Sequence, residues 1–312
     1  MGRYLFKRLA QVPVVLFVLI TLSFFMVRLA PGNPFSGEKK MDPLVQEALN
    51  EKYGLDASMP VQFVRYLGGL VTLDLGPSYK QKGLTVNEII AEKAPVSAVL
   101  GLSAMIVALA IGLTAGIVSG IRQNSNFDYG SMAVAMVGLS VPTFVVGPLL
   151  ALVFGLKFGW FPVAGYERML GPIPYPQYLV LPTIALALPF AARIARLTRA
   201  GMLDVINQDY IRTAWAKGLR ERVIVLRHAL RGALLPVVSF LGPAVAQILT
   251  GSLVVEQIFQ IPGIGYEFVK SALNRDYTLV LGTVILFGVL LVLFNLLVDV
   301  LYGFLDPRIR YS

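Results

Sequence analysis

Six long apolar runs constrain the fold of this 312-residue chain more than any other feature. A helix that crosses a bilayer needs about 20 apolar residues, and only helices or closed barrels satisfy their backbone hydrogen bonds in lipid. The runs cover residues 9–27, 96–121, 129–156, 178–192, 232–255 and 277–298. Pro182 and Pro189 interrupt the fourth run, although uncharged residues extend it back to Gly171. The sequence therefore predicts an all-α polytopic membrane protein with six transmembrane helices.

The first run is expected to stay in the membrane and not to be cleaved as a signal peptide. Its 19 uncharged residues exceed the roughly 7–15 of a signal-peptide core. Arg28 and Pro31 stand where a cleavage site requires small residues.

The composition excludes several kinds of site. Charged residues make up only 14% of the chain, against about 25% in soluble domains. The chain has no cysteine, so it has neither a disulfide framework nor a thiolate metal site, and its single histidine, His228, cannot form a multi-histidine metal site.

The charges indicate how the chain is oriented. If the N-terminus is cytoplasmic, the inner loops and tails hold 15 basic and 6 acidic residues, and the outer loops hold 12 of each. The whole net charge of +9 then lies on one face. Short cytoplasmic loops carry an excess of Lys and Arg, so both termini are predicted to be cytoplasmic. Charge distributed in this way indicates contact with anionic lipid and not with nucleic acid.

The chain divides into three parts by this topology. Residues 1–95 form an N-terminal span and an extracytoplasmic loop region, residues 96–305 a transmembrane domain, and residues 306–312 a cytoplasmic tail. Within the outer loop, Asp42–Pro43 predicts the start of one short helix that Gly54 ends, and Pro60 the start of a second. These helices are expected either to cap the span ends or to contact cargo.

No motif supplies energy for transport. The sequence has no GxxxxGK[ST] phosphate loop and no HExxH or GxSxG motif. Acidic residues are almost missing from the apolar runs, whereas proton-coupled carriers use ionisable relays in the membrane. A transporter built from this chain would therefore receive its energy from a partner.

The basic segment 193–231 is the candidate for contact with that partner. It carries nine Lys/Arg and three acids between two apolar runs. Within 208–218, Tyr210, Ile211, Ala214 and Trp215 fall on one helical face, and Gly218 is placed to end the helix in a left-handed conformation. The residues alone leave two interpretations open: a docking helix for another protein, or an interfacial helix on anionic lipid.

The same segment resembles the EAA loop of binding-protein-dependent ABC importers. Arg212-Thr213-Ala214 occupies the Glu-Ala-Ala position, and Gly218 and Leu235-Pro236 follow at the expected spacing. Arg in place of Glu is similar to the peptide-importer branch, whereas Trp215 stands where that branch usually has Arg. Further resemblance to the B-subunit permeases of oligopeptide and dipeptide importers is carried in order along the chain by Ser23-Phe24-Phe25-Met26, Val141-Pro142-Thr143-Phe144, Pro262-Gly263-Ile264-Gly265, Leu273-Asn274-Arg275-Asp276-Tyr277 and Asp306-Pro307-Arg308.

The resemblance implies a type I importer fold in the bacterial inner membrane. In that family two homologous permeases form the pore, two ATPases bind to EAA loops, and an extracytoplasmic binding protein delivers peptide. The chain itself would bind no cofactor, since ATP and Mg would be used by the ATPase subunits. The ATPase-docking residues would be Tyr210, Ile211, Arg212, Thr213, Ala214, Trp215 and Gly218. The cargo alternatives are nickel chelates, opines and oligosaccharides, and the alternative class is a self-contained channel.

Two further groups are candidate site residues. Ser140, Thr143, Gln247 and Thr250 are polar residues within apolar runs, so they are expected either to bond between helices or to line the translocation path. Glu256, Pro262, Gly263 and Gly265 surround a turn after the fifth run. This turn is expected to act as an outer gate or binding-protein contact, or else as a compact seal over the span ends.

Overall fold

The computed structural model describes residues 2–30, 34–35, 43–249 and 253–305. Thr250 and the tail 306–312 lie outside the described residues. The chain folds into helices and one small hairpin, β1 (Arg168–Leu170) with β2 (Ile173–Pro174). The longer helices are α1 (Gly2–Leu29), α4 (Val86–Ile121), α5 (Asn126–Ser140), α7 (Pro176–Ile206), α11 (Leu235–Leu249) and α14 (Tyr277–Leu305). The shorter ones are α2 (Pro43–Lys52), α3 (Met59–Val71), α6 (Thr143–Leu150), α8 (Asp209–Ala216), α9 (Glu221–Val223), α10 (Leu230–Ala233), α12 (Leu253–Phe259) and α13 (Ile264–Leu273), with π-helical stretches η1 (Ala151–Lys157) and η2 (Ile224–Ala229).

The described helices include four that are long and apolar enough to cross a membrane, and six crossings result if each of two bent pairs is one span. The bent pairs are α5 with α6–η1, at 106°, and α9–α10 with α11, at 56°. Each of these segments overlaps one of the six apolar runs of the sequence, with different bounds. The chain is therefore a mostly helical protein with four to six candidate spans.

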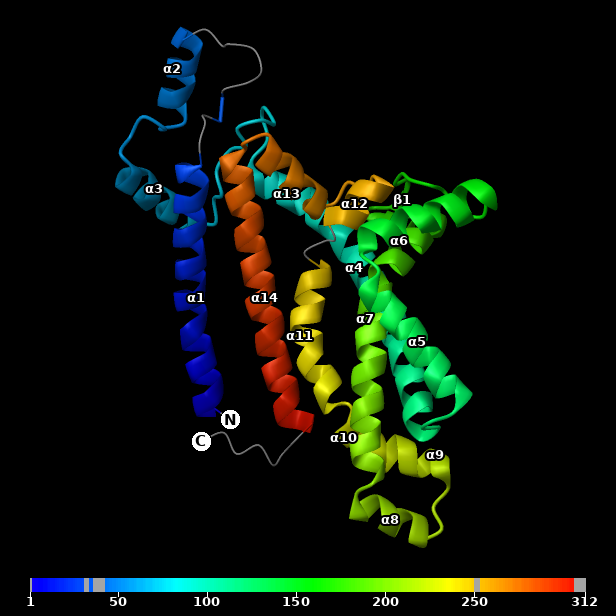
Figure 1. The fold of residues 1–312 in the computed structure, drawn as a ribbon. Helices are drawn as coiled ribbons and strands as arrows, with labels where there is room; N and C mark the ends of the chain where they lie inside the picture. The colour runs from blue at the N-terminus through cyan, green and yellow to red at the C-terminus, as the bar shows by residue number, and fades with distance from the viewer. Residues whose placement is uncertain (1, 31–33, 36–42, 250–252, 306–312) are drawn as a thin grey trace.

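The uncharged length of the third apolar run suggested one straight helix, but the structure has two helical segments with a sharp bend between them. Pro142 caps α6, and Val141 before it is extended, because a residue preceding proline is pushed out of the helical region. The chain turns there, so α6 and η1 lie across the direction of α5 in Figure 1.

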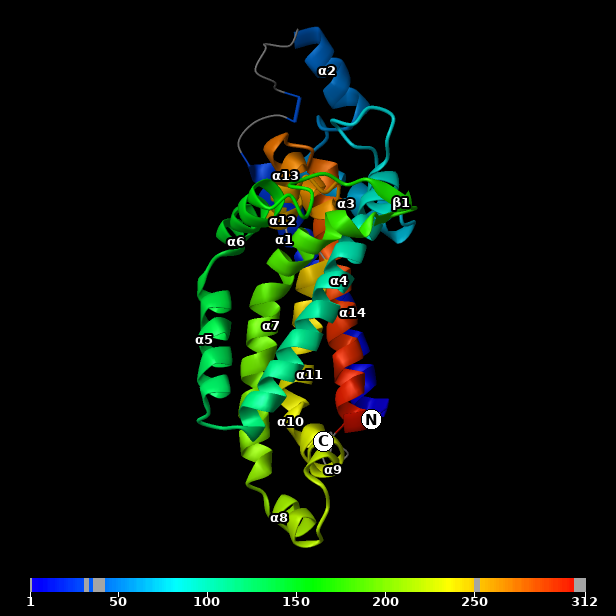
Figure 2. The ribbon, with the colours of Figure 1, turned by 90° about the vertical axis from the view of Figure 1, so that its right-hand side faces the viewer.

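Close packing of α4 against α7 forms the centre of the bundle (Figure 2). Gly112, Gly116 and Gly120 recur every fourth residue on α4 and face α7. A Cβ at Gly116 would lie 2.5 Å from the carbonyl oxygen of Ala195 and 2.5 Å from the Cβ of Thr198. Small residues permit such close approach of helices in lipid, so this stripe sets the α4–α7 distance.

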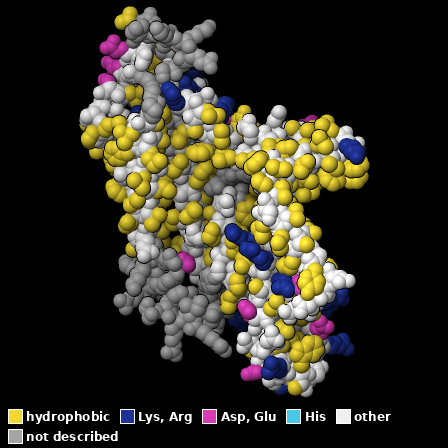
Figure 3. Space-filling view, viewed as in Figure 1, with side chains coloured by type: hydrophobic (Ala, Val, Ile, Leu, Met, Phe, Trp, Pro, Cys, Tyr) yellow, Lys and Arg dark blue, Asp and Glu magenta, His cyan; other side chains and the backbone are white. Residues whose placement is uncertain are grey.

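The remaining spans extend the bundle to one side. In Figure 1, α11 lies between α7 and α14, and α1 packs on the outer side of α14. Exposed apolar side chains cover much of α1, as expected for a lipid-facing helix, and the space-filling view in Figure 3 shows a broad hydrophobic surface over the middle of the molecule.

The two ends of the molecule carry different elements. Helices α2, α3 and α13 lie at one end, and α8 and α9 at the other, where α1 begins and α14 ends (Figure 1). The two short helices predicted within the outer loop are confirmed as α2 and α3, and Gly54 follows α2 with a φ of +63°.

Candidate functional site

Helix α7 extends beyond the predicted end of the fourth span and includes the start of the basic segment 193–231. The sequence placed the end of the fourth span at Ala192, but α7 continues without a break through Arg193, Arg196 and Arg199 to Ile206. Arg, Ala and Leu are good helix formers, so the first charge does not end the helix. The predicted loop 193–231 is therefore helical throughout its first part, and α8 follows α7 after only two residues.

Helix α8 is amphipathic, with its apolar side turned toward its own chain. Ile211 and Ala214 are buried in a cluster with Met202, Ile224 and Ala229. Gly218 adopts a φ of +73°, as its position after α8 predicted, and the chain turns back there toward α9. The burial of Ile211 and Ala214 fixes α8 against η2 and leaves these two side chains unavailable at the surface.

The exposed side of α8 includes Tyr210, Arg212, Thr213 and Trp215, and it is here called the docking face after the role that the sequence predicts for these residues. Tyr210 and Trp215 are each about half exposed, at 49% and 50%. Arg212 lies 3.7 Å from Asp209 in an exposed pair that contributes little stability. The docking face thus offers two aromatic rings at the tip of the molecule, a combination that is enriched at protein interfaces.

Two contacts connect α8 rigidly to the bundle through α7. Arg199 forms a bidentate pair with Asp128 on α5, with Nε–Oδ1 and Nη2–Oδ2 distances of 2.6 and 2.7 Å. Gly201 approaches the backbone of Ala233 on α10 so closely that no side chain fits. These contacts join α7, which directly precedes α8, to α5 and α10.

A cavity of about 390 Å³ lies between α5, α6, α7 and α11. It is lined by Leu139, Thr143, Leu186, Pro189, Phe190, Arg193, Phe240 and Gln247. The structure thus brings two of the predicted pathway residues, Thr143 and Gln247, into one cavity. Ser140 is exposed and is not among the lining residues.

Sequence reasoning missed Arg193 as a cavity residue. It assigned Arg193 to the cytoplasmic loop because an uncharged run was taken to end at the first charge. The structure places the guanidinium carbon 5.4 Å from the centroid of the Phe240 ring. A helical projection continued past Ala192 would have shown that Arg193 follows Leu186 and Pro189 along one face of α7.

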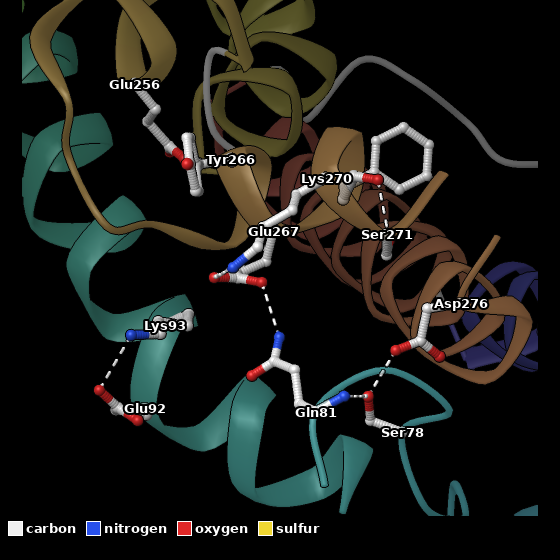
Figure 4. Close-up of polar contacts among 11 residues, drawn as sticks. Ser78, Gln81, Glu92, Lys93, Glu256, Tyr266, Glu267, Lys270, Ser271 and Asp276 are labelled. Carbon is white, nitrogen blue, oxygen red and sulfur yellow. Dashed lines mark hydrogen bonds and ion pairs between the residues drawn. The ribbon is translucent and has the colours of Figure 1, made fainter. Parts of the chain in front are cut away.

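The turn at residues 260–266, here called the outer turn, is folded around a buried carboxyl group. Glu256 is fully buried and accepts hydrogen bonds from the Ser97 hydroxyl at 2.6 Å and the Tyr266 N–H at 2.8 Å. Ser97 in turn accepts from the Ile264 N–H at 2.9 Å. Figure 4 shows Glu256 pointing toward Tyr266.

Close packing requires glycine at two positions of the outer turn, Gly263 and Gly265. A Cβ on Gly263 would overlap Ser97 and Glu256, and one on Gly265 would lie 2.9 Å from Glu256 Oε2. This geometry is a compact turn that packs on α4 at Ser97. Glu256, Gly263 and Gly265 are buried within this turn, whereas Pro262 is partly exposed.

A second buried carboxyl group fixes the outer loop to the start of α14. Asp276 accepts hydrogen bonds from the Tyr79 N–H at 3.1 Å and the Leu279 N–H at 3.3 Å, and it also pairs with the Ser78 hydroxyl (Figure 4). Gln81 donates to Glu267 at 2.9 Å. Asp276 directly precedes α14, and its partners Ser78 and Tyr79 lie nearly 200 residues away in the sequence. Among the described residues no three of His, Asp and Glu gather as a metal site would require.

Burial raises the pKa of Glu256 from 4.5 to about 7, against the lowering effect of its hydrogen bonds from Ser97, Tyr266 and Gly265. Glu256 lies beyond Val255, the last residue of the fifth apolar run of the sequence. Because the folded pKa is the higher one, the folded chain holds more protons than the unfolded chain between these values. Its stability is therefore expected to fall as the pH rises from about 4.5 to about 7.

Replacing Glu256 with glutamine should remove this part of the pH dependence. We expect the variant to gain stability relative to the wild type between pH 5 and pH 8, by on the order of 3 kcal/mol. Thermal unfolding of the purified chain in detergent at both pH values measures the difference. Glu51→Gln, at an exposed position, is the matched control, and equal pH dependence of wild type and Glu256→Gln would contradict the prediction.

Comparison with known proteins covers almost the whole chain. Residues 112–311 match the family described as binding-protein-dependent transport system inner membrane component, and residues 1–101 match its N-terminal companion family. The chain is 47% identical over 311 residues to the oligopeptide transport system permease protein OppB of Salmonella typhimurium, with 100% of both chains covered.

Two relatives from Bacillus subtilis extend the similarity. The dipeptide transport system permease protein DppB is 42% identical over 310 residues, covering 99% of this chain and 98% of its own. The oligopeptide transport system permease protein AppB is 40% identical over 319 residues, with both chains fully covered. With these matches and its membrane helices, the chain belongs to the family of binding-protein-dependent transport system inner membrane components, as a permease subunit of an ABC importer and not an enzyme.

Proposed function

We propose that this chain forms, with a homologous second permease, the membrane pathway through which an ATP-driven importer moves oligo- or dipeptides. An extracytoplasmic binding protein delivers the peptide, and two ATPase subunits bind and hydrolyse ATP with Mg. The observation that carries this proposal is the full-length similarity to permeases named for oligopeptide and dipeptide transport. The cavity lined by Thr143, Gln247 and Arg193 supports it, because a pathway for polar cargo needs polar groups within the membrane.

The proposal includes a location and an orientation. The chain is a six-span protein of the bacterial plasma membrane with the type I importer fold, and both termini and α8 face the cytoplasm. Support comes from the charge distribution of the sequence and from the common end that α8 shares with the start of α1 and the end of α14 (Figure 1). The proposed parts are residues 1–95, the transmembrane domain 96–305 with its coupling loop 193–231, and the tail 306–312.

The docking face of α8 is the proposed contact for the ATPase. Trp215 and Tyr210 supply large exposed aromatic area, and the buried Ile211 and Ala214 hold α8 in place for that contact. Gly218 permits the return of the chain, and Arg212 and Thr213 complete the face. The outer turn with Pro262, Gly263 and Gly265 is proposed as an outer gate that the buried Glu256 holds closed.

Co-purification in mild detergent tests the proposed assembly. We expect two ATPase subunits and a second six-span permease to accompany this chain, and peptide to compete with other cargo for the partner binding protein. If nickel chelates, opines or oligosaccharides compete for the binding protein better than peptides do, that class of compound and not peptide is the cargo. Conductance of the purified single chain in a planar bilayer would instead favour a self-contained channel.

Replacing Trp215 with alanine should release the ATPase. Aromatic residues at the centre of an interface commonly contribute 2 kcal/mol or more, so the amount of ATPase retained should fall by roughly tenfold or more. Trp160, which is 63% exposed and lies outside the coupling segment, provides the matched control Trp160→Ala. Equal ATPase retention by the two variants and the wild type would contradict a role for Trp215 in docking.

A further inference from the structure

Arg193 lies near the middle of α7 and directly follows the fourth apolar run of the sequence, which ends at Ala192. It stands 17 residues after Pro176 and 13 residues before Ile206 in α7. At about 1.5 Å per residue these separations are roughly 26 and 20 Å. The Arg193 side chain is exposed in the single chain and lines the cavity beside Phe240, so the cavity holds an accessible positive charge at the end of the fourth apolar run.

The surroundings of Arg193 leave its hydrogen-bond donors free. No described residue forms an ion pair or hydrogen bond with its guanidinium group, although Asp128 pairs with Arg199 two turns further along α7. The contact with Phe240 is a cation–π interaction, which does not consume the N–H donors. Phe190 lies 6.3 Å from Phe240, between ring centroids, so two aromatic rings stand beside the charge.

The cavity around Arg193 has the form of a ligand site. Its volume of about 390 Å³ lies within the roughly 300–1,000 Å³ of small-molecule pockets, which combine apolar walls with a few polar groups. Arg193 is the one ionisable residue of its lining, and Thr143 and Gln247 add uncharged polar groups from α6 and α11. Leu139, Leu186 and Pro189 form the apolar part of the wall.

We propose that Arg193 binds a carboxylate group of the cargo in this cavity during translocation, which for a linear peptide is its C-terminal carboxylate. This inference rests on the proposed function. The guanidinium group presents paired N–H donors that match the two oxygens of a carboxylate. The amide of Gln247 and the hydroxyl of Thr143 complement peptide groups, while the aromatic and aliphatic wall accommodates side chains of different kinds.

The test uses the complete transporter with its partner subunits and binding protein, reconstituted in liposomes. ATP-dependent uptake is measured for one tripeptide with a free C-terminal carboxylate and for the same tripeptide with a C-terminal carboxamide. Because all variants share one binding protein, its own preference cancels when the ratio of acid to amide uptake is compared between variants. The variants are Arg193→Gln and Arg193→Lys, with Arg196→Gln as the control at an exposed arginine that does not line the cavity.

Loss of a charge-assisted hydrogen bond should lower uptake of the free acid by roughly ten- to a hundredfold in Arg193→Gln, with little change for the amide. Arg193→Lys should keep part of the preference for the acid, and Arg196→Gln should keep all of it. An unchanged acid-to-amide ratio in Arg193→Gln would overturn the inference while leaving the proposed function intact. Loss of the second permease from the Arg193→Gln complex would also overturn it, because Arg193 would then pair with that subunit. Absence of ATP-dependent uptake of either peptide by the wild type would overturn the proposed function itself.

Discussion

We expect that the Gly116→Leu variant does not fold. The Cβ alone would lie 2.5 Å from the carbonyl oxygen of Ala195 and 2.5 Å from the Cβ of Thr198, and real Cβ atoms do not approach backbone so closely. The contacted atoms belong to the backbone and to a β-branched residue, so neither can move aside without shifting α7. Overpacking of this kind costs about 1–3 kcal/mol even where side chains can rearrange, and here the two central helices must separate.

The gain in helix propensity cannot offset that cost, because leucine stabilises a helix over glycine by only about 1 kcal/mol. Size-exclusion chromatography of the detergent-solubilised chain should show loss of the monodisperse peak, and ATP-driven uptake should fall to background. Gly130→Leu is the matched control, since Gly130 also lies in a helix but has no atom within 4 Å of its Cβ position. A monodisperse Gly116→Leu chain with normal uptake would show that α4 and α7 do not need this approach.

The approximate positions of the spans follow from the sequence because a helix that crosses the bilayer needs about 20 consecutive apolar residues, which can be read directly along the chain. Each of the six apolar runs overlaps a candidate span or a bent pair in the structure. The bend at Pro142 was present in the sequence as a proline signal, but its angle depends on how α6 packs against α7 and α12. Likewise, the start of α2 and the end of α8 follow from Asp42–Pro43 and Gly218, since both are local conformational preferences.

The candidate site was less accessible from the sequence, because its geometry comes from contacts between distant segments. Periodicity placed Tyr210, Ile211, Ala214 and Trp215 on one face of α8. The structure buries Ile211 and Ala214 within the chain and leaves Tyr210 and Trp215 about half exposed. Glu256 was recognised as a residue near a turn, whereas its bond to Ser97 joins residues 159 positions apart. Because Arg193 is charged, the sequence analysis ended the fourth span before it, although α7 continues through this residue.

Replacing Arg199 with methionine should be among the most destabilising changes of a charged side chain in this protein. Asp128 is only 1% exposed, and its two oxygens accept from Nε and Nη2 of Arg199 at 2.6 and 2.7 Å. Without Arg199, a buried carboxylate would keep only the Asn124 N–H at 3.0 Å and its place at the start of α5. Removal of one partner of a buried ion pair costs about 3–5 kcal/mol, which corresponds to a fall in melting temperature of roughly 5–15 °C.

The reciprocal change, Asp128→Asn, should cost less, because the Arg199 side chain is 25% exposed and can extend its charge toward water. The double variant Asp128→Asn/Arg199→Met should then be more stable than Arg199→Met alone, since it no longer buries an unpaired charge. Melting temperatures of the three variants in detergent form a double-mutant cycle, with Arg122→Met as control at an exposed arginine. Additive effects would mean that the pair contributes no coupling. A clear coupling energy would show that the Arg199–Asp128 pair holds α7 against α5 and so helps to fix the position of α8, which follows α7.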